Sequence, residues 1–164
     1  MASHTIHRVK YRRKREGKTN YKKRLKLLIS RKPRLVVRKT NTQIITQIIQ
    51  YDANGDKIIV GFNSTNLKKL GWKHSCKNIP AAYLAGLIIG KKAQEKNIKE
   101  AILDLGLQTP ISGSKLYATL QGAVDSGLKV PCSEEIFPNK ERLEGQHTKN
   151  NTIKKDFEII KKKC

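Results

Sequence analysis

The chain has 164 residues and a mass of 18.6 kDa, and its 35 Lys and Arg against 13 Asp and Glu give a formal net charge of +22. The length suits one domain with extensions rather than two full domains. Hydrophobic residues make up 37% of the chain, too many for a wholly disordered protein and few for a fully compact one. Because such a charge repels itself unless a polyanion neutralises it, nucleic acid is the first candidate partner and an anionic membrane surface the second.

Membrane insertion and export are both disfavoured. The longest segment without a charged residue, 78–90, has 13 residues, whereas a bilayer span needs roughly 20. Residues 1–24 contain no apolar run typical of a signal peptide and lack the serines of an organelle transit peptide. The three cysteines, Cys76, Cys132 and Cys164, are odd in number and widely spaced. We therefore expect no disulfide framework and a reducing, cytoplasmic location.

The first 32 residues carry more than half of the positive charge. They hold 13 Lys and Arg and one acid, a net charge of +12, and the remaining 132 residues carry +10. Because this segment has almost nothing apolar to bury, alone it should be disordered or a fluctuating helix, with helical composition from Tyr21 to Ser30. On a nucleic acid it would order by neutralising phosphates, and Tyr11 and Tyr21 would stack on a base or ribose. The helical part also has a docking stripe formed by Leu25, Leu27, Leu28 and Ile29.

Residues 33–131 have the pattern of a globular domain that begins with three strands. β-Branched residues are concentrated in 35–37, 44–51 and 57–62, which favours strands. The isoleucine doublets of 44–51 also suit a helix. The sequence of 52–56 is a strong turn signal, because Asn and Gly tolerate positive φ. Three strands joined by tight turns form an antiparallel meander.

Helical signals follow the meander. Residues 64–70 suit a short helix that Gly71 ends, and Pro80 lies near the first turn of a longer, apolar helix that extends to about Lys96. Residues 101–105 have the pattern of a fourth strand. Because a helix connects this strand to the meander, it should lie parallel to one of its neighbours in the sheet.

A further helix should start after Ser114, a suitable N-cap, and end near Gly127. Residues 132–164 are polar, then basic, so we expect a segment that wraps the surface and a basic tail that forms a small helix docking on RNA or protein. The predicted fold class is α/β. It has a mixed sheet, made of an antiparallel meander plus a parallel strand, packed with helices and preceded by a basic extended arm over 1–32.

No catalytic or metal-binding pattern is complete. His74, Cys76 and Cys132 resemble parts of a zinc-deaminase signature, but its Glu and its second Cys are missing, so unliganded thiols are the better interpretation. The segment 109–115 places Ser and Lys at a helix N-terminus, which suits a phosphate and ordinary capping equally, without the spacing of a phosphate loop. We predict no enzyme, no metal and no cofactor.

Five segments resemble one known family through their order and spacing. They are residues 12–21, 31–41, 71–73, 78–86 and 103–107. Over residues 5–147 the chain is similar to the archaeal and eukaryotic form of the large-subunit ribosomal protein family that binds 5S ribosomal RNA (the L-eighteen family in archaeal naming). The resemblance implies an α/β sandwich that joins 5S RNA to the large ribosomal RNA in the central protuberance of the ribosome, with neighbouring large-subunit proteins as further partners and no membrane.

We expect RNA contacts from the arm, from the first hairpin and from two loops. Basic side chains would contact phosphates, and Thr19, Tyr21 and Asn41 would contact ribose or bases. Trp72 either stacks on RNA or packs under its own loop, and packing is favoured. The residues predicted to bind RNA are Arg12, Arg13, Lys14, Arg15, Lys18, Thr19, Tyr21, Lys22, Lys23, Arg24, Arg34, Arg38, Lys39, Asn41, Lys73 and Lys115.

Two other functions compete with this hypothesis. A non-specific DNA- or chromatin-binding protein also needs a basic arm, although the chain lacks helix-turn-helix, basic-zipper and zinc-finger spacing. A metal nuclease needs acids clustered at strand ends, whereas Asp52 and Asp56 fall in a turn and Asp104 is isolated in the sequence.

Overall fold

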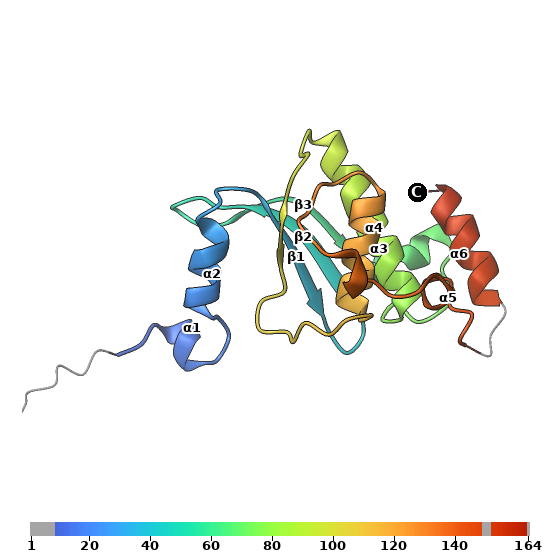
Figure 1. Cartoon of the computed structure of the whole chain (residues 1–164), viewed down its shortest axis with the longest axis horizontal. Coiled ribbons are helices and arrows are strands. Elements are labelled where there is room, and N and C mark those ends of the chain that lie inside the picture. Colours follow the sequence, from blue (N-terminus) through green and yellow to red (C-terminus); the bar gives the residue numbers. More distant parts are fainter. Residues whose placement is uncertain (1–8, 149–151, 164) are drawn as a thin grey trace, which may run out of the picture.

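The computed structural model describes residues 9–148 and 152–163. Figure 1 shows a sheet with helices on both sides. In chain order the elements are α1 (Arg12–Arg15), α2 (Tyr21–Leu28), β1 (Arg34–Lys39), β2 (Ile44–Gln50), β3 (Lys57–Asn63), the 3-10 helix η1 (Ser64–Leu70), α3 (Ile79–Glu95), β4 (Ile102–Asp104), α4 (Lys115–Asp125), the 3-10 turn η2 (Glu134–Ile136), α5 (Lys140–Leu143) and α6 (Thr152–Lys163).

The sheet has the mixed topology predicted from the sequence. Its strand order is β3-β2-β1-β4, with β1–β2 and β2–β3 antiparallel and β4 parallel to β1. In the register, Leu35 of β1 lies opposite Ile48 of β2 on one side and Leu103 of β4 on the other. The turn between β2 and β3 contains Gly55 at a φ of 144°, which is why a glycine is needed there. The meander and the parallel fourth strand are thus both confirmed.

Helices α3 and α4 cover one face of the sheet and form the core with it (Figure 1). Asn78 begins α3, since its Oδ1 accepts a hydrogen bond from Ala81 N at 2.9 Å, and Pro80 occupies the first turn. The two helices pack with their backbones nearly in contact. A Cβ on Gly86 would overlap the carbonyl oxygen of Thr119, and glycine is therefore required where the helices cross.

The C-terminal helix α6 packs on α3 of its own domain (Figure 1). One side of α6 is apolar at helical spacing and buried, and it consists of Ile153, Phe157 and Ile160. The ring of Phe157 lies 5.6 Å from that of Tyr83, centroid to centroid, while Ile159 on the other side of the helix is 51% exposed. The sequence predicted a small docking helix here, and the surface on which it docks is the protein's own core.

Helices α1 and α2 lie across the sheet from α3 and α4 (Figure 1). The composition of 21–30 predicts a helix, and the structure has α2 there, begun by Asn20, whose Oδ1 accepts a hydrogen bond from Lys23 N at 3.1 Å. The expected docking stripe is only half formed. Leu27 and Leu28 are partly buried, whereas Leu25 and Ile29 are 64% and 72% exposed. Residues 1–8 of the predicted arm lie outside the described residues.

Two local predictions have clear structural outcomes. Trp72 is 2% exposed and its Nε1 donates a hydrogen bond to the Ser75 carbonyl at 3.1 Å, so the indole packs under its own loop. Ser114 is the N-cap of α4, but no hydrogen-bond partner for its buried Oγ exists among the described atoms. Within 9–148 and 152–163, no helix combines the length and the apolar character needed to cross a membrane.

Candidate nucleic-acid interface

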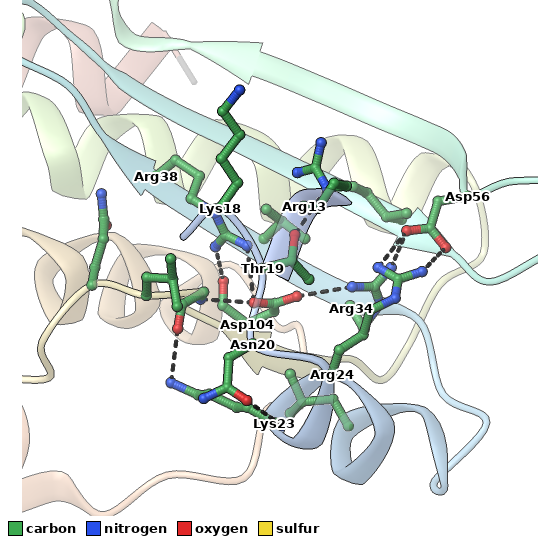
Figure 2. Close-up of a pocket in the computed structure, with 16 residues that line it drawn as sticks. Arg13, Lys18, Thr19, Asn20, Lys23, Arg24, Arg34, Arg38, Asp56 and Asp104 are labelled. Atoms are coloured by element: carbon green, nitrogen blue, oxygen red, sulfur yellow. Dashed lines mark hydrogen bonds and ion pairs between the residues drawn. The ribbon is translucent and has the colours of Figure 1, made fainter. Parts of the chain in front are cut away.

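The arm meets the sheet over the face that the core helices leave open. Side chains alternate along β1, so Leu35 and Val37 point to the core while Arg34, Val36 and Arg38 point toward the arm. Between arm and sheet lies a cavity of about 330 Å³ (Figure 2). Its polar and charged lining consists of Arg13, Lys18, Thr19, Asn20, Lys23, Arg24, Arg34, Arg38, Asp56, Asp104 and Gln108. Six cations against two carboxylates leave this cavity strongly positive.

Arg34 lies at the centre of an ion-pair chain on the sheet. Its Nη1 donates to Asp104 Oδ2 at 2.8 Å and its Nη2 donates to Asp56 Oδ2 at 2.6 Å (Figure 2). The side chain is 3% exposed, and a buried guanidinium is tolerated only when it is paired in this way. Arg34 was predicted to contact phosphate. The structure instead places it beneath the surface, where it joins two carboxylates.

Asp56 connects the sheet to the arm. Besides Arg34, it accepts two parallel hydrogen bonds from Arg24 of α2, each at 2.9 Å (Figure 2). Such bidentate pairs are the strongest and most directional contacts between Arg and carboxylate. Burial by itself would raise the pKa of Asp56, but the hydrogen bonds from Arg24 and Arg34 outweigh it, so the pKa lies below the ordinary aspartate value. Asp56 is therefore negatively charged at neutral pH.

Asp104, at the end of β4, is the last residue of the ion-pair chain that runs through Arg34. Its Oδ1 accepts from Arg38 Nη2 at 3.0 Å and from Gly106 N at 2.8 Å. Burial would raise the pKa of Asp104, but the charge of Arg38 and the hydrogen bond from Gly106 lower it more, and the net pKa is below its ordinary value. The Gly106 carbonyl in turn accepts a hydrogen bond from Lys23 Nζ of α2 at 3.1 Å. Side-chain hydrogen bonds thus attach α2 at two points, Asp56 and Gly106.

These carboxylates do not form a nuclease site. Asp56 and Asp104 bind the two terminal nitrogens of Arg34, Nη2 and Nη1 respectively. The charge of each carboxylate is neutralised by arginines and is not open to a metal cation. In the part of the chain that the structure describes, no group of three or more His, Cys, Asp or Glu is placed to hold a metal ion. Cys76 is buried and Cys132 is exposed, and neither is bonded to another described cysteine.

The outward side of the arm is basic and accessible. Helix α1, which lies wholly within the described range, consists of four basic residues, and none is buried. Arg13 Nε donates to Thr19 Oγ1 at 2.9 Å, which fixes the loop between the helices. The rings of Tyr11 and Tyr21 are in contact, with centroids 5.2 Å apart and planes tilted by 49°. Lys18, Lys22 and Lys23 are exposed on the same arm.

The structure gathers part of the predicted site and leaves the rest elsewhere. Seven of the predicted residues line the cavity, namely Arg13, Lys18, Thr19, Lys23, Arg24, Arg34 and Arg38. Arg12, Lys14, Arg15, Tyr21 and Lys22 lie on the arm around it. Lys39, Asn41 and Lys73 are exposed on other loops or strand ends, and Lys115 is partly buried at the start of α4. The sequence reasoning missed Asp56, Asp104 and Gly106, whose roles depend on contacts between distant segments.

Comparison with known proteins agrees with this architecture. Residues 5–100 match the family described as ribosomal large subunit proteins 60S L5 and 50S L18. The match covers more than half of the chain and contains the arm, the meander and α3. The chain therefore belongs to this family of large-subunit ribosomal proteins, and it is a structural component of the ribosome rather than an enzyme.

Proposed function

We propose that this protein binds 5S ribosomal RNA and helps attach it to the large ribosomal RNA in the central protuberance of the cytoplasmic ribosome. The observation that carries the proposal is the exposed basic surface of α1 and α2, which is held against a folded domain of the ribosomal family. Neighbouring large-subunit proteins are the further partners that such a position requires.

The proposed mechanism has two parts. Lys and Arg of the arm neutralise backbone phosphates and release condensed counterions, which supplies affinity without sequence specificity. The fixed arrangement of arm and domain then recognises the shape of a folded RNA, and Tyr11 and Tyr21 offer ring faces at the arm surface for a base or ribose. Tyr11, at 73% exposure, is the more accessible of the two.

The arm can be tested by replacing the four basic residues of α1, Arg12, Arg13, Lys14 and Arg15, with Gln. Since each phosphate contact contributes roughly 0.7–0.9 to the slope of log affinity against log salt, losing up to four contacts should flatten that slope by up to about 3. The matched control replaces four lysines of α6, Lys154, Lys155, Lys162 and Lys163, with Gln, which changes the net charge by the same amount at the other end of the molecule. Equal effects of both variants in a filter-binding titration would show that only net charge matters.

Competition between 5S RNA and duplex DNA at fixed salt tests specificity. A protein that recognises the RNA shape should keep its complex with labelled 5S RNA at a DNA excess that displaces a non-specific binder. Equal competition by both nucleic acids would instead favour the DNA- or chromatin-binding alternative.

A further inference from the structure

We propose that Asp56 is a positioning residue for RNA binding, which fixes the arm on the sheet so that α1 and α2 present their basic side chains in one arrangement. The inference rests on the proposed function and deepens it. In a chain of net charge +22, a carboxylate placed within the basic surface is unexpected if affinity comes from charge alone.

The contacts of α2 show why Asp56 matters to its position. No residue of α2, which lies wholly within the described range, is fully buried, and of its leucines only Leu27 and Leu28 are partly buried, so apolar burial alone does not fix its position. The directional contacts to the domain are the bidentate pair of Arg24 with Asp56 and the single hydrogen bond from Lys23 to the Gly106 carbonyl. Of these two, only the first is a pair of opposite charges.

Asp56 is itself held in place by the sheet. Its Oδ2 is shared between Arg24 Nη1 and Arg34 Nη2, at 2.9 and 2.6 Å, and Arg34 is anchored to Asp104 of β4. A continuous chain of ion pairs therefore connects the arm to β4, the edge strand that lies parallel to β1. Its members, in order, are Arg24, Asp56, Arg34 and Asp104 (Figure 2).

Removing the charge of Asp56 should release the arm. Arg24 and Arg34 would then face each other across a neutral side chain, and two guanidinium groups at this spacing repel. An arm that is docked only part of the time lowers the measured affinity by the docked fraction. If Asp56→Asn leaves about one arm in ten docked, the affinity for 5S RNA should fall about tenfold.

The predicted change in RNA affinity on removing the charge of Asp56 has the opposite sign to the change that net charge alone predicts. Deleting a negative charge from an RNA-binding surface should tighten binding if only the summed charge matters. Positioning predicts weaker binding. The slope of log affinity against log salt should stay the same, because the same phosphates are contacted in the final complex, which separates Asp56 from the α1 arginines whose loss flattens the slope.

The experiment compares the full-length wild type with Asp56→Asn, Asp56→Glu and Asp52→Asn, using 5S RNA as the probe. Asp52 is the matched control, because it lies in the same β2–β3 turn and its ion-pair partner is the exposed Lys57 rather than the arm. We expect Asp56→Asn to bind about tenfold more weakly, Asp52→Asn to bind as tightly as the wild type or slightly more tightly, and Asp56→Glu to recover most of the affinity.

A second measurement follows the arm without RNA. Limited trypsin digestion should cut between Lys22 and Lys26 faster in Asp56→Asn than in Asp52→Asn, while the domain stays folded in both, because Arg34 keeps its pair with Asp104. If Asp56→Asn binds RNA as tightly as Asp52→Asn and its arm is cut no faster, the positioning role is wrong and the proposed function stands. If the wild type shows no preference for 5S RNA, the proposed function fails, and the positioning role in RNA binding fails with it.

Discussion

The α2 and α6 helices are attached to the same domain by opposite kinds of interaction. Helix α2 lies on the open face of the sheet and is held by Arg24 on Asp56 and by Lys23 on the Gly106 carbonyl. Helix α6 lies on α3 and is held by a buried apolar side that includes Phe157, at 4% exposure. Both helices are rich in lysine, so composition alone does not distinguish them.

The difference shows how a basic helix can be positioned without hiding its charge. Apolar docking covers a helix side permanently, and its strength depends on buried area. An ion pair fixes a helix through one or two side chains and leaves the rest of its surface free for a ligand, but it depends on pH and salt. We therefore expect α6 to behave as part of the core and the arm to behave as an adjustable attachment.

The strongest test of the apolar attachment is Phe157→Ala. Truncating a buried phenylalanine typically costs about 3–5 kcal/mol, because apolar surface is lost and a cavity remains. Ile159→Ala is the matched control, since Ile159 is 51% exposed on the same helix, and it should change the free energy of unfolding by less than about 0.5 kcal/mol. Urea denaturation measures both. A cost below about 1 kcal/mol for Phe157→Ala would mean that α6 lies outside the cooperative core.

Gly122→Ala tests the core against which α6 packs, with a somewhat smaller effect. In an exposed helix this change stabilises by about 1 kcal/mol. Here the new methyl group would overlap the Tyr83 carbonyl of α3, and overpacking of this kind costs about 1–3 kcal/mol. Gly61→Ala is the control, because its Cβ would meet Gln47 Cγ at an ordinary 3.8 Å. A stabilised Gly122→Ala protein would contradict the close crossing of α3 and α4.

The fold was predictable because its signals are local. The β-branched runs, the turn at 52–56 and Pro80 each act within a few residues, and together they predict the meander and α3. The parallel position of β4 followed from the helical connection between strands. The side on which α6 docks was not predictable, since its apolar stripe predicts burial without saying which surface buries it.

The positive charge of the candidate site was predictable from the sequence, but the ion pairs within it were not. The arm residues were found because a basic run is visible in one stretch of sequence. The burial of Arg34 and its pairing with Asp104, 70 positions away, could not be foreseen, because they depend on the parallel register of β1 and β4. Asp104 looked isolated and Asp56 looked like part of a turn for the same reason, and only the folded sheet brings them within reach of the same guanidinium.

Acid should release the arm before the core, which is the smallest effect expected here. The pKa values of Asp56 and Asp104 are lowered in the folded protein, so their attachment is complete above about pH 5 and is lost as the pH falls through these values, below about 3.9. Hydrogen bonds to charged groups of this kind contribute about 1.5–3 kcal/mol, but they attach the arm and the domain stays folded without them, so the effect on unfolding of the domain is small. NMR titration of the amides of α2 should show this transition while those of 81–89 in α3 stay unchanged.

Because Glu16, paired with Arg12 and Lys18, titrates on the same arm, Asp56→Asn separates the contributions. Its α2 amides should already report a released arm at neutral pH, and an unaltered titration in this variant would assign the acid transition to Glu16 or Asp104 instead.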